Sequence, residues 1–564
     1  MSFRRRAFSV LVVVLAFVPR LLSAHVVPMS VPELAAASPH VVVATVEGKQ
    51  SRWNEQHTLI VTDYTLRVEE RLRGTAPDRI SITVPGGTVG RISDELCVSV
   101  HLQPGTRYLL FLGEIGRLAL TPVLGAGQGM FREISGGFAA RGEGWSPVLL
   151  KGRPVRFRDL VGAMRAVVAS TPLAPRSPEK ADPRLPAKVW DPSPGRIAGS
   201  APPLAAPETA AIPAAPADSF PVVEIAGGAP VPAPRRPAGK FVYENLAELP
   251  IVVNPLPSDS PFSPGDQYAM SFWNRYGGDL YRVADPPSPF WSYGNGVFDI
   301  AGFPDGLTLA RQFGFDWSEF SPGVLAFTSR RTRDGVTIEA DVVFNPNKEW
   351  TLDDADGMRT GKPYPFKDVS LHELGHVWGL DHPWETQHVW WDSVMNYKLK
   401  RFYVEELFAD DTSAVRDAHP PGVPLRDGLI SSYVTDHDGI FDVAQYIPAR
   451  PSVSRVKAGG KFSLTSIKVE NVGTVALADP VVEVYLAPTM LSFEGAVLVK
   501  RAKVKGRVPS GATKKVNLGS LRVPPKTPPG TYLLAFFLRD TKDAYQGNNG
   551  AWSSEDVTLE VTGR

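Results

Sequence analysis

LHELGHVWGLDHP, residues 371–383, concentrates three histidines, one glutamate and two glycines in one short stretch. The whole chain of 564 residues contains only 10 histidines, so this density needs a chemical explanation. If residues 371–380 form a helix with Asp368 as the N-cap, His372 and His376 lie one turn apart and project from the same face. Two imidazoles placed in this way can chelate one metal ion.

The third ligand has to come from outside this helix. Gly379 can end the helix, because glycine readily adopts the left-handed conformation that turns the chain, and His382 can then return toward the metal. Three neutral nitrogen ligands leave one tetrahedral position for water, which is typical of a catalytic zinc. The ion lowers the pKa of this water toward about 7. Glu373 can take the proton of the water and later pass it to the leaving amine. The alternative is a polar helix with incidental histidines.

The motif HELGHVWGLDH, followed by SVMNY, resembles the zinc signature and Met-turn of the metzincin metallopeptidases. This resemblance assigns the zinc ligands to His372, His376 and His382. It also implies that Glu373 is the catalytic base and that Met395 is an apolar floor beneath the metal. Tyr397 would approach the metal and stabilise the oxyanion, with a packed aromatic side chain as the alternative. Features of both matrixins and serralysins are present, which leaves the subfamily open.

The region before the motif divides into three segments. Residues 1–24 combine a basic start with a short apolar run, which predicts a secretory signal peptide. Residues 25–170 contain alternating, β-branched runs followed by one helix, an order that resembles the OB-fold of netrin and metalloprotease-inhibitor modules. Residues 171–240 are dominated by proline and alanine, and this composition predicts a tether.

The motif and the region after it form two further units. Residues 241–447 mix helices and strands, as expected for an α+β metzincin-like catalytic domain. Residues 448–564 alternate between turn signals, which predicts a β-sandwich of immunoglobulin type, and VENVGTVALADPVVEVYL resembles the cell-adhesion-related (CARDB) domains. The predicted fold is therefore multidomain, with an OB-like β-barrel, an α+β peptidase domain and a C-terminal β-sandwich.

The composition of the chain limits the classes of binding partner and the cellular compartment that are expected for it. The formal net charge is +1, so there is no broad basic surface for nucleic acid. After the signal peptide no stretch is long and apolar enough for a transmembrane segment. The chain has one cysteine, Cys97, which rules out an intramolecular disulfide and favours a bacterial exported protein. Cys97 is predicted to be a small buried strand residue. Because Val98 and Ser99 follow it, the cysteine-switch motif of animal matrixins is absent and latency through this thiol is not expected.

The leading hypothesis is a secreted zinc endopeptidase that hydrolyses proteins by a glutamate-assisted, zinc-bound water. The alternative is a secreted adhesion or binding protein with a non-catalytic metzincin-like scaffold. The C-terminal domain would bind a surface or an extracellular protein. The N-terminal domain either lies over the cleft and restrains the enzyme or is an independent surface-binding module. A calcium site is a further hypothesis for Asp353, Asp354 and Asp356 in TLDDADG, with a solvated turn as the alternative.

Overall fold

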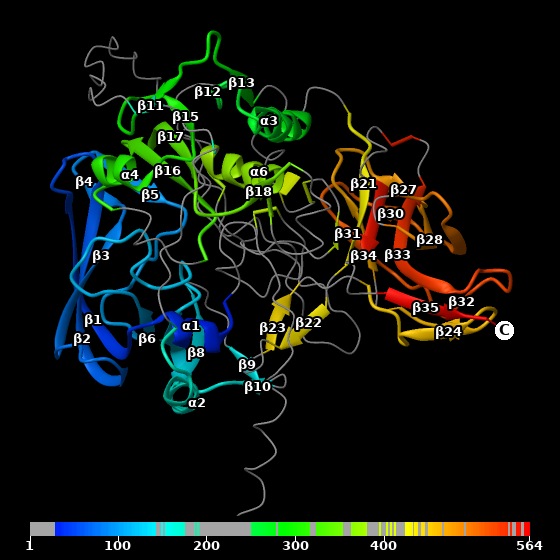
Figure 1. Ribbon diagram of the computed structural model, residues 1–564, viewed down its shortest axis with the longest axis horizontal. Coiled ribbons are helices and arrows are strands. Elements are labelled where there is room, and N and C mark those ends of the chain that lie inside the picture. The colour runs from blue at the N-terminus through cyan, green and yellow to red at the C-terminus, as the bar shows by residue number, and fades with distance from the viewer. Residues whose placement is uncertain are drawn as a thin grey trace, which may run out of the picture.

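The structure is a computed structural model that describes residues 29–142, 148–150, 153–174, 185, 189–190, 250–277, 280–315, 323–352, 363–380, 394–395, 402–403, 407–408, 411–412, 424–432, 434–437, 442–445, 449–464, 467–489, 492–539, 542–543, 549–553 and 558–563. Over these residues the protein is rich in β-strands, has few helices and contains several separate sheets, as a multidomain chain would (Figure 1). The predicted signal peptide, the aspartates of the calcium hypothesis, His382 and Tyr397 lie outside the described residues.

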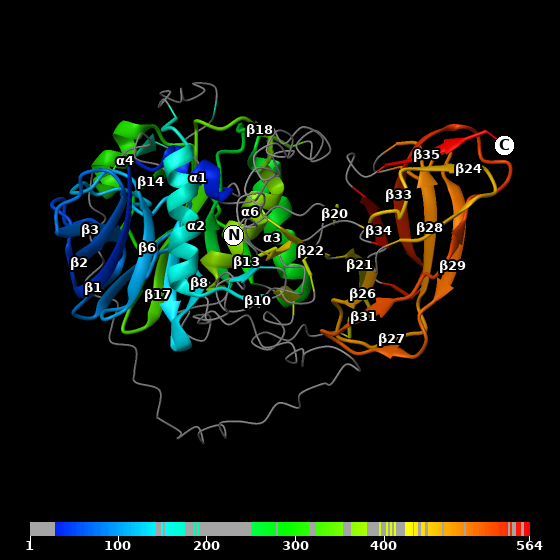
Figure 2. The same cartoon turned by 90° about the horizontal axis from the view of Figure 1, so that it is seen from below.

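The N-terminal unit is built on a six-stranded antiparallel sheet. Its strands lie in the order β3-β2-β1-β6-β7-β8, with bounds Arg79–Pro85, Ile60–Arg73, His40–Trp53, Arg107–Leu112, Met130–Ile134 and Phe138–Arg141. A short 3₁₀ turn, Ser135–Gly137, joins the last two. Helix α1, Val31–Ala37, begins at a capping box between Ser30 and Glu33. Helix α2, Phe157–Ser170, lies beside this sheet where the sequence predicts a helix, and it buries Leu160 and Met164 (Figure 2).

The central unit has a mixed sheet. Strands β12, β13, β15 and β17 pair in parallel, and β16 runs antiparallel to β17; their bounds are Ile251–Asn254, Tyr281–Val283, Phe298–Gly302, Val336–Phe344 and Ala326–Arg333. The described residues of this unit include the helices α3 Ser263–Gly277, α4 Gly306–Phe313 and α6 Phe366–Val377. Helix α6 packs against α3 on one side and β16 on the other, so its side chains are almost all buried.

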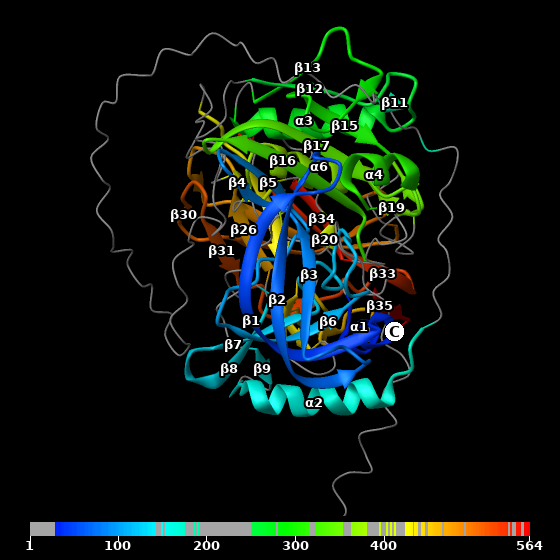
Figure 3. The same ribbon diagram turned by 90° about the vertical axis from the view of Figure 1, so that its left-hand side faces the viewer.

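Two strands of the N-terminal unit extend this central sheet. Strand β4, Gly87–Val89, and strand β5, Ile92–Leu96, form a hairpin, and β5 pairs antiparallel with β16. The resulting seven-stranded sheet has the order β13-β12-β15-β17-β16-β5-β4. Figure 3 shows the hairpin at the end of the N-terminal sheet, next to the green strands of the central unit. Nothing in the strand pattern of the sequence predicts this pairing.

The C-terminal unit consists of two main sheets whose strands pair antiparallel, except that β24 pairs in parallel with β35. The larger sheet contains β28 Val481–Ala487, β29 Val497–Lys503, β33 Gly530–Arg539, β34 Gly550–Ser553, β35 Thr558–Thr562, β24 Arg455–Lys457 and β20 Phe402–Tyr403. The smaller contains β21 Gly428–Ser432, β26 Ile467–Asn471 and β31 Thr513–Val516. Strands β20 and β21 precede the expected start of this unit at residue 448, yet they pair inside it.

Short ladders connect the remaining segments. A small sheet joins the N-terminal β9 and β10 to the later β22 and β23, with bounds Leu149–Leu150, Arg153–Pro154, Val434–His437 and Asp442–Gln445. Four two-stranded ladders are β11 Val189–Trp190 with β14 Phe290–Trp291, β18 Trp350–Thr351 with β19 Tyr364–Pro365, β25 Lys461–Phe462 with β32 Leu521–Arg522, and β27 Leu477–Ala478 with β30 Arg507–Val508.

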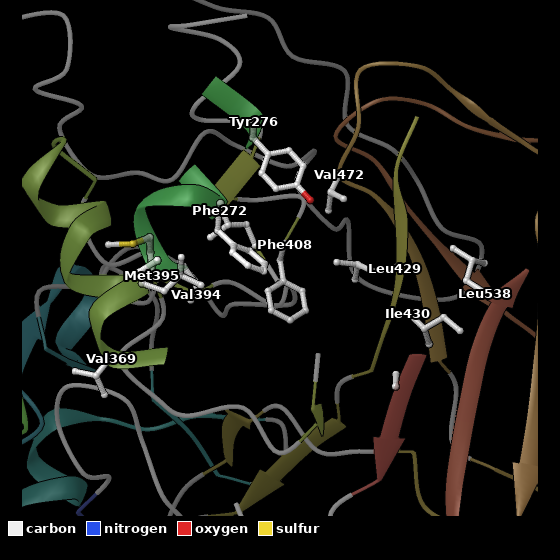
Figure 4. Close-up of a cluster of buried hydrophobic side chains, with 14 of the residues drawn as sticks. Phe272, Tyr276, Val369, Val394, Met395, Phe408, Leu429, Ile430, Val472 and Leu538 are labelled. Atoms are coloured by element: carbon white, nitrogen blue, oxygen red, sulfur yellow. The ribbon is translucent and has the colours of Figure 1, made fainter. Parts of the chain in front are cut away.

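A continuous apolar cluster joins the central and C-terminal units. Figure 4 shows Tyr276 of helix α3 directed toward Val472, with Phe408 and Leu429 between the two units. The Tyr276 hydroxyl donates a hydrogen bond of 2.8 Å to Asp427 Oδ2, which satisfies a polar group inside this contact. None of the helices in the described part of the chain combines the length and the apolar character needed to cross a membrane.

Candidate metal centre

Helix α6 carries the histidine motif and begins earlier than the sequence suggests. It starts at Phe366, immediately after Pro365, whose side chain gives no capping hydrogen bond. Asp368 therefore lies in the first turn and is not the N-cap, so this detail of the prediction is wrong. The helix ends at Val377, and Gly379 follows with a φ of +106°, which is the kind of helix stop predicted there.

Two aromatic residues fix the position of this helix. Trp273 of α3 is fully buried and its Nε1 donates a hydrogen bond of 2.8 Å to the Leu371 carbonyl. The Tyr281 hydroxyl donates to the carbonyl of Leu374, and burial raises the pKa of this phenol well above its ordinary value. Both anchors act on the turn that contains His372, so they hold the ring in place through the backbone.

The two histidines of the motif that the structure describes, His372 and His376, converge through their Nε2 atoms, which lie 2.8 Å apart. The Nδ1 atom of His372 lies 2.6 Å from the Val394 carbonyl, and that of His376 lies 2.6 Å from the Leu380 carbonyl. A carbonyl oxygen only accepts, so each Nδ1 carries a proton, and in a neutral ring each Nε2 then presents a lone pair. Two lone pairs at this distance repel unless a positive centre lies beside them. The residues present therefore fit a zinc ion, with the backbone carbonyls fixing the tautomers.

The turn that contains Met395 is held beside the same rings. Val394 N donates a hydrogen bond of 2.7 Å to Asp411 Oδ2, and Met395 N donates one of 3.2 Å to Asp411 Oδ1. The Val394 carbonyl is also the acceptor for His372. Met395 is buried against helix α6, in the place that the predicted apolar floor would occupy (Figure 4). Asp411 thus positions the carbonyl that contacts the His372 ring, and the sequence pattern did not indicate this role.

Gly375 allows this turn to approach the helix, and its replacement gives a test. A Cβ at residue 375 would lie 2.2 Å from Met395 Sδ and 2.9 Å from Trp273 Cζ2. Alanine gains about 1 kcal/mol in helix propensity, but overpacking a full core costs about 1–3 kcal/mol. We expect Gly375→Ala to lower the free energy of unfolding by up to about 2 kcal/mol and to weaken zinc binding, measured by urea unfolding and zinc titration.

The control for this substitution is another helical glycine. Gly162 lies in α2, and a Cβ there would meet nothing within 4 Å. Gly162→Ala should therefore raise the unfolding free energy by about 0.5–1 kcal/mol without changing zinc affinity. Equal effects of the two substitutions would contradict the close packing of Met395 against Gly375.

The carboxylate of Glu373 lies beside the histidines and is fully buried. Thr328 of β16 donates its hydroxyl proton to this carboxylate. Cys97, directly after β5, places its Sγ 3.8 Å from Glu373 Oε2. Cys97, Glu373 and His376 each offer an atom within 4.8 Å of the others. Burial raises the pKa of the Cys97 thiol, and the nearby negative charge of Glu373 raises this pKa further.

Cys97 and Thr328 are the two neighbours of Glu373 that the sequence analysis missed. Cys97 is predicted to be a small buried strand residue, whereas it lies directly after strand β5, is only partly buried and contacts Glu373. Cys97 and Glu373 are separated by 276 positions, and no short sequence motif indicates a contact between residues so far apart. The assignment of His372, His376 and Glu373 as site residues stays a prediction, with a geometry that accommodates it.

Comparison with known families supports the class of the central unit. The family model described as Matrixin matches residues 313–419, a span that includes β16, β17, helix α6 and the turn of Met395. This match supports a metzincin-like domain and suggests a zinc metallopeptidase. It covers a minor part of the chain, and it says nothing about the N-terminal or C-terminal units.

Comparisons with curated proteins and with solved structures do not indicate a fold or a function for the chain. No curated protein matches the chain. Among solved structures, the chain is similar to the Pseudomonas fluorescens alkylpurine DNA glycosylase AlkC bound to DNA containing an abasic site analog, at 14% identity and a TM-score of 0.15. That similarity covers 24% of this chain and 30% of the other. At this TM-score it says nothing about fold or function.

Proposed function

We propose that the chain is a secreted zinc-dependent endopeptidase that hydrolyses peptide bonds of proteins. The observation that carries this proposal is the convergence of the Nε2 atoms of His372 and His376, 2.8 Å apart, with the Glu373 carboxylate beside them. A scaffold that only fills space has no need for two imidazole lone pairs directed at one point next to an acid.

Each residue would have a defined task. His372 and His376, together with His382, would hold the zinc, which when bound lowers the pKa of water and polarises the scissile carbonyl. Glu373 would accept the proton of the attacking water and deliver it to the amine nitrogen as the C–N bond breaks, leaving one carboxylic acid and one amine. Thr328 would orient the carboxylate through its hydroxyl. Tyr397 would stabilise the oxyanion.

The flanking units extend this proposal. Residues 25–170 would be the OB-like domain, residues 241–447 the metzincin-like catalytic domain, and residues 448–564 a CARDB-like, immunoglobulin-type sandwich that binds an extracellular surface or protein. Export would follow from residues 1–24. Calcium binding near residues 353–356 would be an additional feature of the catalytic domain.

A non-catalytic binding scaffold is the second candidate, and the burial of the site favours it. His372 and Glu373 each have a relative exposure of 0%, and that of His376 is 4%. A peptide does not reach a carboxylate that is closed off in this way. The two candidates differ in whether the site ever opens.

Metal removal tests the proposed function directly. We expect about one zinc per chain by elemental analysis, because the predicted ligands form one site. A chelator such as 1,10-phenanthroline should remove the zinc together with casein hydrolysis, and added zinc should restore both. Hydrolysis that persists in metal-free protein would contradict the proposal, and so would a zinc-free chain after refolding with excess zinc.

A further inference from the structure

Strand β16 has a neighbour on each side, and its outer neighbour comes from the N-terminal unit. Five register pairs join β5 to β16, from Leu96 opposite Ser329 to Ile92 opposite Arg333. Backbone hydrogen bonds continue the ladder past both ends, from Cys97 N to the Thr328 carbonyl at 3.1 Å and from Asp334 N to the Arg91 carbonyl at 2.9 Å. Without β4 and β5, β16 would be the edge strand of the central sheet.

This edge passes directly beside the catalytic carboxylate. Thr328 contacts Glu373 with its hydroxyl, while its backbone N–H donates to Cys97 Sγ at 3.2 Å. Cys97 therefore forms hydrogen bonds with both the backbone N–H and the carbonyl of Thr328, at the point of the edge closest to Glu373. Any extended chain that reached Glu373 along this edge would need the same backbone groups.

An open sheet edge is a docking surface for an extended peptide, because its N–H and C=O groups form main-chain hydrogen bonds with an added strand. Granting the peptidase function proposed above, we infer that the β4–β5 hairpin occupies the edge of β16 that an extended substrate would pair with and so blocks the site from within the chain. The N-terminal unit then acts as an intramolecular competitor, and a substrate enters only when this hairpin has left the edge.

The hairpin is fastened by a buried ion pair. Arg331 Nε and Nη2 donate to Asp94 Oδ1 and Oδ2 at 2.7 and 2.8 Å, and the two side chains are 5% and 0% exposed. Asp94 Oδ2 also accepts the N–H of Ile60 at 2.7 Å, which ties the hairpin to its own sheet. Removing either side chain of this buried, bidentate ion pair is destabilising, because the charge of the other side chain would stay buried and uncompensated.

Apolar side chains reinforce the same contact. One buried cluster combines Leu96 and Val98 of the N-terminal unit with Phe327 and Val343 of the central sheet. Because the hairpin and the edge belong to one chain, the connecting residues keep them at a high effective concentration. A substrate meets only the fraction of molecules in which the edge is open, so its apparent affinity falls by that fraction.

A disulfide lock tests whether the hairpin must leave. Ile92 and Arg333 are register partners near the end of the ladder away from Glu373, and Cys97 is the only native cysteine. Opposed strand positions have a Cα separation that suits a disulfide. In the full-length Ile92→Cys/Arg333→Cys chain, we expect oxidation to lower casein hydrolysis at least tenfold relative to the same protein reduced with a phosphine.

A release variant gives the opposite change. Asp94→Ala removes the buried ion pair and should raise kcat/KM on casein and on a fluorogenic peptide at least tenfold over the wild-type chain. The matched control is Arg52→Ala, which removes a partly exposed ion pair with Asp63 within the N-terminal sheet. This control should stay within about twofold of wild type, as surface ion pairs contribute little. If Asp94→Ala does not fold, the lock still decides the question.

Each protein is also made with Glu373→Gln, so that two failures can be told apart. If Glu373-dependent hydrolysis is present but is the same in the oxidised and reduced lock, and the same in Asp94→Ala and wild type, the hairpin does not compete with substrate and this inference is overturned. If no variant, locked or open, shows Glu373-dependent hydrolysis while zinc is bound, the proposed peptidase function itself is wrong.

Discussion

Replacing Glu373 by glutamine is expected to lower kcat/KM for casein by about 10²–10⁴-fold, the range that a positioned general acid–base group contributes. Glutamine keeps the size of the side chain and can still accept the hydrogen bond from Thr328, but it cannot take a proton from water. Zinc content should not change, because the histidines and not Glu373 are the proposed ligands. The comparison is made in the wild-type chain and in Asp94→Ala, with zinc measured in each sample.

The control is a glutamate of the same unit that lies away from the site. Glu349 is exposed, so Glu349→Gln should leave both hydrolysis and zinc content within about twofold of wild type, as surface substitutions usually do. Equal activity of Glu373→Gln and its parent, with zinc bound in both, would show that the site is not hydrolytic and would favour the binding-scaffold candidate.

Removing the indole of Trp273 is expected to have the largest effect on stability. This side chain is fully buried between α3 and α6 and donates to the Leu371 carbonyl. Trp273→Ala should lower the free energy of unfolding by about 3–5 kcal/mol, the usual result of deleting a large core aromatic residue. Zinc should be released at a lower urea concentration, because the helix that carries the histidines loses its support.

Two further variants separate the contributions of the ring. Trp273→Phe keeps an aromatic ring and removes the Nε1 donor, so its cost should be smaller, about 1–3 kcal/mol. Leu307→Ala changes an apolar residue of α4 that is 59% exposed and should shift the unfolding free energy by no more than about 0.5 kcal/mol. An equal loss for Trp273→Ala and Leu307→Ala would contradict the anchoring role of Trp273.

The sequence predicted the parts of the site that depend on short spacing. A separation of four positions between His372 and His376 places the two rings on one helical face, and Gly379 marks the end of the helix. Helix α2 was also predictable, since Leu160 and Met164 recur at helical spacing. In these cases the interactions that determine the structure lie within a few turns of chain, so the local pattern of residues indicates them.

The remaining features depend on contacts between distant residues. Asp411 binds the turn at Val394 across 17 positions, and Cys97 reaches Glu373 across 276. The alternating pattern of DELCVSVHL, residues 94–102, predicts a strand but does not indicate which strand it joins, because any open sheet edge offers the same N–H and C=O groups. The pairing of β5 with β16 buries the ion pair of Asp94 with Arg331, two residues 237 positions apart that no local sequence pattern connects.

The order of the strands along the chain also affects how the protein folds during its synthesis. Residues 87–96 leave the ribosome well before residues 326–333, and domains generally fold as they emerge, from the N-terminus onward. The hairpin can therefore form before β16 is synthesised, so β16 can pair with it on folding and need not remain an open sheet edge that favours aggregation. If the proposed peptidase function holds, the Glu373 site would be covered by the hairpin from the time at which the central sheet forms.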